Sequence, residues 1–255
     1  DRKGPVAIEV TGSTRFGPGS TIQFLGEPLD ALYTATNVYW VHVDKTLAKR
    51  IANLTTAPPT AGTPVTTYAA TTVVNDNYLY SVTAPGSDPW YDKFALSIGG
   101  TPKTVSTTVD IADPVAGQPA TVSVDMWGVS FGPTPDQHHV RLSVNGTVIS
   151  DTHFDDTARL NLQGSAPAGL LHAGSNTIDV TVVGDTGVFV DIVAVNTWSV
   201  AFQRSNVAQD GRLDLNAAGQ RIDVNGLPSG TVYAYRVAAN GTVSRLTTRV
   251  SAATR

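Results

Sequence analysis

The sequence predicts an all-β fold: a β-sandwich of jelly-roll type with an additional N-terminal β region and a short C-terminal β appendage. Only 15% of its 255 residues are charged, against about 25% in an average globular protein. Thr and Val, whose branched side chains suit pleated strands, recur throughout. The 23 Gly and 15 Pro supply turns. Long runs of Leu, Glu and Lys at helical spacing are missing.

The first predicted region, residues 1–112, contains short apolar stretches separated by Gly- and Pro-rich loops. Residues 6–10 and 21–25 alternate as strands do. Residues 37–43 place apolar side chains on both faces, so we expect them to form a central strand with Trp40 in the core.

The second predicted region, residues 113–205, is the most regular. Residues 121–127, 139–144 and 176–182 alternate apolar and polar side chains. The Asn145-Gly146 pair is the strongest short-range hairpin signal. This succession of short strands and turns predicts a sandwich or jelly roll.

The third predicted region, residues 206–255, is short and includes a second hairpin signal at Asn240-Gly241. A segment of this size is marginal for a core of its own. We therefore expect it to pack on its neighbour.

Charge and cysteine content exclude several functions. The net charge of −4 provides no basic surface for nucleic acid, and no apolar stretch is long enough for a membrane span. The chain has no Cys, which excludes a thiol nucleophile, a thiolate metal site and a disulfide framework. The first residue is Asp1, which fits either an expressed fragment or a processed secreted chain. The low charge and Thr/Ser-rich strands favour a secreted or cell-surface protein.

Several blocks resemble the region that precedes the catalytic domain of gingipain-like cysteine peptidases. Residues 22–30, followed by the Tyr-Thr-Ala-Thr-Asn-Val-Tyr-Trp block at 33–40, resemble its opening. Residues 88–92, 136–146 and 227–237 are similar to later parts of it. Residues 170–178 are similar to a loop and strand of galactose-binding-like jelly rolls.

The resemblance implies an accessory β region that positions a C-terminal peptidase domain or binds a partner surface. The catalytic Cys and His of that family belong to the peptidase domain, and no position of this Cys-free chain can carry the nucleophile. The resemblance therefore predicts no catalytic residue within this chain.

The adjacent pair His138-His139 is a candidate ligand-binding site. Neighbouring strand residues face opposite sides of a sheet, so the pair cannot easily chelate one metal ion. The alternatives are a solvent-exposed pair near a turn, or a metal or sugar site. The other histidines considered, His42 and His172, are isolated and read as structural.

Acidic residues offer a candidate calcium site. Asp88 and Asp92 flank a Pro-Trp-Tyr loop, and Ca²⁺ prefers 6–8 oxygen ligands. The alternative is a solvated turn above Pro89 and Trp90. The cluster of Asp151, Asp155 and Asp156 leaves the same two alternatives open. Asp110 and Asp113 are a further candidate for a calcium site, which we rank below the other two.

Tryptophans offer a candidate sugar site, because a flat indole can stack on a pyranose ring. Trp90 falls in a loop, and Trp127 lies in register with outward-facing Thr121, Ser123 and Asp125, so both are candidates for exposure. Trp40 and Trp198 lie within predicted strands, so we expect both to be buried in the core. A core or interface role is the alternative for each.

Three functions remain open. The first is a non-catalytic accessory region of a secreted gingipain-like peptidase. The second is a stand-alone carbohydrate-binding module. The third is a secreted polysaccharide-acting enzyme, which would need two suitably separated carboxylates. No Gly-x-Ser-x-Gly motif supports a serine hydrolase.

Overall fold

The computed structural model describes residues 4–12, 16–27, 29, 31, 33–43, 46, 48–82, 84–86, 88–216, 218, 221–228 and 230–251. Over these residues the fold is all-β, as predicted, with strands and loops and no helix. The chain forms two compact units. One is Pro64–Leu227, and the other combines Asp1–Thr63 with Pro228–Arg255.

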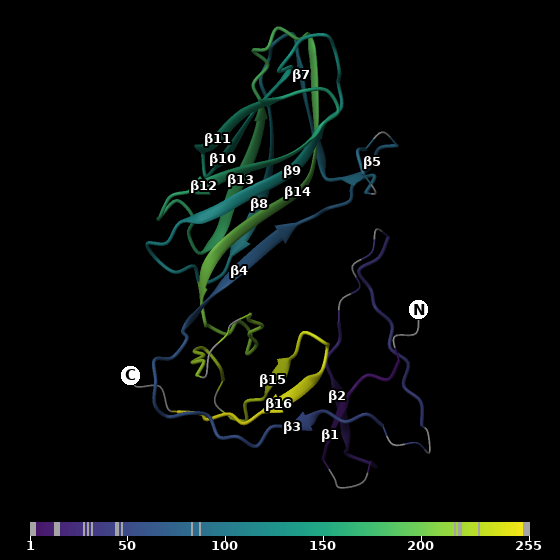
Figure 1. The fold of residues 1–255 in the computed structure, drawn as a ribbon, viewed down its shortest axis with the longest axis vertical. Coiled ribbons are helices and arrows are strands. Elements are labelled where there is room, and N and C mark those ends of the chain that lie inside the picture. Colours follow the sequence, from purple (N-terminus) through teal and green to yellow (C-terminus); the bar gives the residue numbers. More distant parts are fainter. Residues whose placement is uncertain are drawn as a thin grey trace. The chain divides into compact units, whose positions relative to one another are not determined.

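Two antiparallel sheets form a sandwich in the unit Pro64–Leu227 (Figure 1). The four-stranded sheet has the order β11 (Thr147–Phe154), β10 (His138–Val144), β13 (Gly174–Val182) and β8 (Lys103–Ile111). The five-stranded sheet has the order β12 (Arg159–Ala166), β9 (Ala120–Gly128), β14 (Val190–Ser205) and β4 (Thr67–Val74), with β7 (Lys93–Ile98) also paired to β14.

The core of the sandwich comes from alternate positions of both sheets. On β9 the fully buried residues are Val122, Val124 and Met126, and on β10 they include Val140 and Leu142. Burying each such aliphatic side chain stabilises the fold by about 1.5–3 kcal/mol. The apolar residues of the alternating pattern predicted from the sequence are therefore the ones that form this core.

The centre of the five-stranded sheet is the 16-residue strand β14. It pairs with β9 on one edge, and with β7 and then β4 on the other. The register shifts between Val195 and Thr197, which leaves Asn196 as an extra residue. Residues 190–195 and 197–205 therefore form one bulged strand.

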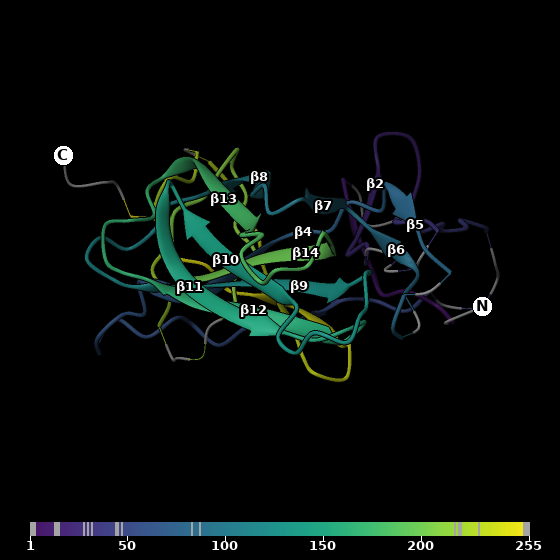
Figure 2. The same cartoon turned by 90° about the horizontal axis from the view of Figure 1, so that it is seen from above.

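Strands β11 and β12 follow one another in the chain but belong to different sheets. Figure 2 shows them curving along one side of the sandwich. The loop between them, residues 155–158, lies beside the start of β10, because Asp155 Oδ1 accepts a hydrogen bond of 3.3 Å from Gln137 N.

Strand pairing crosses the predicted boundary between residues 112 and 113. The strands β4, β7 and β8 precede that boundary, and they pair with β14 and β13, which follow it. Pairing between distant segments leaves no local signal in composition, so the sandwich takes in more of the chain than residues 113–205.

The predicted third region is also divided between the units. Residues 206–227 belong with the sandwich, where Asn206 Nδ2 donates hydrogen bonds to Val65 O (2.9 Å) and Asp223 O (3.0 Å). Residues from Pro228 onward belong with the N-terminal residues.

The other unit is assembled from both ends of the chain. It holds the hairpin of β1 (Ile8–Thr11) and β2 (Thr21–Phe24) and a sheet of β15 (Ala234–Val237), β16 (Val243–Leu246) and β3 (Ala52–Asn53). Across it, Tyr235 donates a 2.6 Å hydrogen bond to Glu9, and Arg245 forms an ion pair with the same carboxylate.

The prediction of a central strand at residues 37–43, with Trp40 in the core, is wrong. This segment has no strand pairing, and the side chains of Trp40 and Val43 are 89% and 97% exposed. Its apolar composition was the reason to expect burial, but Tyr39 is the aromatic that packs within the unit, 4.9 Å from the ring of Phe24.

No helix in the described part of the chain has the length and apolar character that a membrane span requires.

Candidate functional site at the loop end of the sandwich

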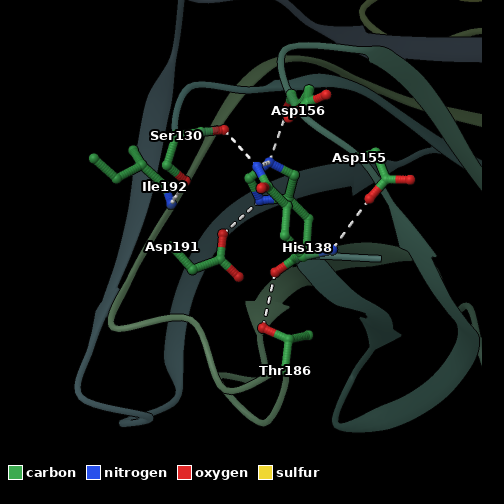
Figure 3. A network of polar contacts seen from close by, with 8 residues as sticks. Ser130, His138, Asp155, Asp156, Thr186, Asp191 and Ile192 are labelled. Carbon is green, nitrogen blue, oxygen red and sulfur yellow. Dashed lines mark hydrogen bonds and ion pairs between the residues drawn. The ribbon is translucent and has the colours of Figure 1, made fainter. Parts of the chain in front are cut away.

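Loops of the sandwich meet around the first residues of β10. They are residues 129–137, 155–158 and 183–189. Gln137 N donates to Asp155 Oδ1, and Thr186 Oγ1 donates to Gln137 O at 2.9 Å (Figure 3). The loops therefore place polar groups on both sides of His138 and His139.

His138 points into the sandwich and is fully buried. Its Nδ1 lies 2.5 Å from Asp191 Oδ1, a separation that requires a proton between them. Its Nε2 lies 2.9 Å from the carbonyl oxygen of Asp156 and 3.1 Å from Gln137 Nε2, so its role as donor to the carbonyl or acceptor from the amide depends on the tautomer. The ring stacks on Phe154 with centroids 4.6 Å apart.

Gly128 makes this arrangement possible. A Cβ at this position would lie 1.8 Å from Asp156 O and 2.4 Å from His138 Nε2. Only a residue without a side chain fits beside this hydrogen bond.

The buried dyad of His138 and Asp191 is not a serine-hydrolase triad. In a triad the serine hydroxyl gives its proton to the histidine nitrogen that is distal to the carboxylate. Here the partners of that nitrogen are Asp156 O and Gln137 Nε2, and Ser130 Oγ accepts a 2.9 Å hydrogen bond from Ile192 N.

Two buried acceptors at this position receive no hydrogen bond from the described residues. One is Asp191 Oδ2, within the dyad, and the other is Gln137 Oε1, beside it. The Gln137 amide is oriented by its Nε2, which donates to Ser130 O at 2.7 Å. Unsatisfied buried acceptors are uncommon in folded proteins and mark a position that calls for explanation.

His139 points to the opposite face of the same sheet, where it meets carboxylates from two elements. Its Nδ1 lies 2.7 Å from Asp185 Oδ1, and its Nε2 lies 2.5 Å from Asp151 Oδ1. Its ring stacks on His153, the residue opposite it on β11, with centroids 4.0 Å apart. Arg141 Nε in turn donates to Asp151 Oδ2 at 2.6 Å.

Electrostatics in this outer cluster favour the charged forms. Burial lowers the pKa of His139, but hydrogen bonds to Asp185 and Asp151 outweigh it and raise that pKa above its ordinary value. Hydrogen bonds from Arg141 and then His139 lower the pKa of Asp151. A hydrogen bond from His139 likewise lowers the pKa of Asp185.

The histidine pair was therefore predicted in part. The two rings lie on opposite faces, as strand alternation predicts, but neither is the solvent-exposed turn residue that was the simpler expectation. Reasoning from sequence missed His153 and Asp185. The signal for His153 was the Asn145-Gly146 turn, since counting back from it pairs residue 139 with a residue near 153.

Ligand atoms of His139, His153 and Asp185 all lie within 4.8 Å of one another. Among the described residues this is the group of His and acidic side chains with the proximity to hold a metal ion.

The prediction that Trp127 is exposed is wrong. It lies on the outer face of the sheet as the register predicts, yet it is only 2% exposed. Tyr91, from the two-stranded ribbon of β5 (Leu79–Tyr80) and β6 (Trp90–Tyr91), packs edge-on against it at 5.5 Å. Trp198 is fully buried, in agreement with its predicted core role.

The other predicted sugar-binding tryptophan, Trp90, is half-buried. Its ring makes an edge contact with the exposed ring of Tyr80, with centroids 5.2 Å apart.

The predicted calcium pair has protein partners of its own. Asp92 is 2% exposed, and its Oδ2 accepts hydrogen bonds from Trp198 Nε1 (2.9 Å) and Lys93 Nζ (3.0 Å). Asp88 Oδ1 accepts a hydrogen bond from Trp90 N, as in a turn. An ammonium group on Asp92 offsets the charge that a calcium ion would need.

The remaining acidic candidates have separate roles. Asp151 belongs to the outer histidine cluster, and Asp155 and Asp156 lie in the loop beside His138. Asp113 pairs with Arg204 at 3.3 Å and accepts a hydrogen bond from Gln209.

No protein-family model and no curated protein sequence matches the chain. Among solved structures, it is similar to dimeric latent PorU from Porphyromonas gingivalis, at 15% identity and a TM-score of 0.58. That match covers 81% of this chain and 20% of PorU, so the chain spans a small part of the longer protein.

Weaker similarities are to carbohydrate-binding modules. The module CBM36, in complex with calcium and xylotriose, matches at 14% identity and a TM-score of 0.33, covering 51% of this chain and 98% of the module. A family 35 module from Clostridium thermocellum matches at 15% identity and a TM-score of 0.32, covering 55% of this chain and 98% of the module. The likeness to PorU establishes a shared β architecture.

Proposed function

We propose that this chain is a non-catalytic accessory region of a larger secreted or cell-surface protein, of the kind that precedes the catalytic domain in gingipain-like cysteine peptidases. The observation that carries the proposal is the exposed apolar segment at residues 37–43. Val38, Trp40, Val41 and Val43 are 66%, 89%, 76% and 97% exposed. Contiguous exposed apolar surface of this kind marks a protein interface.

The segment is held in place. Asn37 Nδ2 donates to Glu27 O at 3.0 Å, and the Tyr39 hydroxyl accepts a 2.7 Å hydrogen bond from Glu27 N. Anchoring alternate residues while leaving Trp40 exposed presents a defined apolar surface to a neighbour. A C-terminal peptidase domain is the neighbour that the sequence resemblance favours, and the occurrence of a similar fold as 20% of PorU agrees with a role inside a longer chain.

The gene provides the direct test of this proposal. We expect the reading frame to continue past Arg255 into a domain that carries a Cys and a His. In that full-length protein, docking should shift the emission of Trp40 to shorter wavelength, and Trp40→Ser should remove the shifted component. A full-length protein with no such domain would overturn the proposal.

A second candidate is a carbohydrate-binding module. Tyr78 and Tyr80 are 71% and 55% exposed, and Tyr80 packs against Trp90. Arg159 reaches the loop between β5 and β6, where its guanidinium would lie 3.6 Å from a Cβ at Gly86, and it binds Asp125 through two hydrogen bonds of 2.8 and 2.7 Å. Aromatic faces beside charged hydrogen-bonding groups are suited to stack on and orient a sugar ring.

A glycan array tests this second candidate. If the ribbon of β5 and β6 binds glycan, Tyr80→Ala should weaken binding about tenfold, which corresponds to a loss of about 1.4 kcal/mol. Tyr33→Ala, in the other unit, is the matched control and should bind as the wild type does. An array on which the intact chain binds nothing would count against the candidate.

A further inference from the structure

We propose that His139, His153 and Asp185 form a binding site for one divalent transition-metal ion, with Zn²⁺ the favoured ion. The site lies on the outer face of the four-stranded sheet and does not depend on which parent protein contains the chain. It is distinct from the predicted calcium pair Asp88 and Asp92.

Strand geometry brings two of the ligands together. His139 on β10 and His153 on β11 are directly opposite one another in the antiparallel register, and their rings already touch. Opposed residues on one face have Cβ atoms about 4.5–5.5 Å apart. Two imidazoles at that separation can reach one ion.

Asp185 supplies the third ligand from the loop after β13. Its carboxylate lies 2.7 Å from His139 Nδ1, and the ligand atoms of all three residues fall within 4.8 Å. Asp185 and His153 are exposed, so their side chains can adjust around an ion. The nitrogen lone pairs of two stacked rings lie in parallel planes and do not meet at one point. The exposed His153 ring must therefore tilt toward the ion when it binds.

The surroundings of His139 match the support that metal-binding histidines have in proteins. A ligating histidine almost always donates its second N–H to a carboxylate, a backbone carbonyl or water, which fixes the ring and increases its basicity. When the ion replaces the proton on Nδ1, His139 Nε2 still donates to Asp151, 2.5 Å away. Asp151 is in turn held by Arg141.

The ligand types decide the metal. Imidazole nitrogen with one carboxylate suits Zn²⁺ and its transition-metal neighbours, whereas Ca²⁺ requires 6–8 oxygen ligands. Three protein ligands leave the fourth tetrahedral position of Zn²⁺ to water or to a group from a bound partner. The ion would also connect the loop 183–189 to the hairpin of β10 and β11.

The test is a calorimetric titration of the whole chain with ZnCl₂. We expect one ion per chain, and at least about tenfold weaker binding in His153→Ala and in Asp185→Asn. Both altered side chains are exposed, so these variants should keep the wild-type circular dichroism spectrum. The matched control His172→Ala removes an exposed histidine of the same unit and should leave Zn²⁺ affinity unchanged.

Two further measurements separate this site from weaker explanations. Asp151→Asn should reduce Zn²⁺ affinity by about 10–100-fold while the stoichiometry stays at one, as expected for a residue that orients a ligand. Free Zn²⁺ should raise the melting temperature progressively, and CaCl₂ at the same concentration should not. Wild-type Zn²⁺ affinity in both His153→Ala and Asp185→Asn, or equal stabilisation by Ca²⁺, would overturn the proposal.

Discussion

At Gly128, the missing side chain is what allows His138 to reach the backbone of Asp156. Since a Cβ would overlap Asp156 O and the imidazole, we expect Gly128→Ala to lower the free energy of unfolding by about 1–3 kcal/mol or more. Urea unfolding measures this change. It should be accompanied by altered near-ultraviolet circular dichroism from the disturbed loop end.

Gly132→Ala is the control for this prediction. Gly132 lies in the loop that follows Gly128, and a Cβ there would meet its nearest neighbour, Gln137 Oε1, at an ordinary 3.5 Å. Its stability should therefore stay within about 0.5 kcal/mol of the wild type. Equal stability of the two variants would contradict the close approach at Gly128.

Single residues also show where prediction from sequence stops. The alternation of β10 correctly placed His138 and His139 on opposite faces. Their burial depends on Asp191, Asp185 and the loop 155–158, which are distant in sequence and give no local signal. Trp127 is a similar case, because its face was predictable but Tyr91, which covers it, belongs to a ribbon that is separated from β9 in the sequence by β7 and β8.

Among the elements, the hairpin of β10 and β11 is the one that its turn defines most clearly. Asn145 and Gly146 both have positive φ, 47° and 81°, as a type I′ turn requires. The Asn145 side chain also donates to Leu170 O (2.8 Å) and accepts from Thr177 N (2.9 Å). The amide therefore ties the turn to the segment before β13 and to β13 itself.

We expect Asn145→Ala to lower the free energy of unfolding by about 1–3 kcal/mol, because it removes these hydrogen bonds and strains a left-handed backbone. Thermal or urea unfolding gives the value. Asn161→Ala, on the exposed face of β12, should change stability by less than about 0.5 kcal/mol. A loss at position 145 no larger than at 161 would show that the turn is held by its backbone alone.

The reliability of strand prediction varied with the kind of pairing. Both Asn-Gly turns lie in hairpins, since β15 and β16 flank Asn240-Gly241 as β10 and β11 flank Asn145-Gly146. Residues 37–43 had the composition of a strand but have no partner strand among the described residues. Strand propensity describes what a segment can do, and the presence of a free sheet edge decides whether it does so.

At the scale of the molecule, the unit that joins the two ends of the chain should respond to alkaline pH. Burial, together with the hydrogen bond to Glu9, raises the pKa of Tyr235 from 10.0 to about 12. Between these values the unfolded chain loses the phenolic proton while the folded chain retains it. The stability contributed by Tyr235 is therefore present below pH 10 and is lost as pH rises through about 12.

Two measurements check this behaviour. In a titration of phenolate absorbance, Tyr235→Phe should remove one of the last groups to ionise. In melting experiments, the wild type should be more stable than Tyr235→Phe at pH 9, and the gap should narrow toward pH 12. A gap independent of pH would rule out the protected phenol.

The long-range pairing of both units has a consequence for how the protein acquires its structure. Tyr68 and Arg204, on the paired strands β4 and β14, are 136 residues apart, and Glu9 and Tyr235 are 226 apart. Closing such loops precedes the contacts that reward it, so folding is slow, on the order of milliseconds to seconds. A nascent chain must therefore keep its early strands unpaired until much later residues have been synthesised. During that delay the unpaired strands stay exposed, and unpaired strand edges are prone to aggregate.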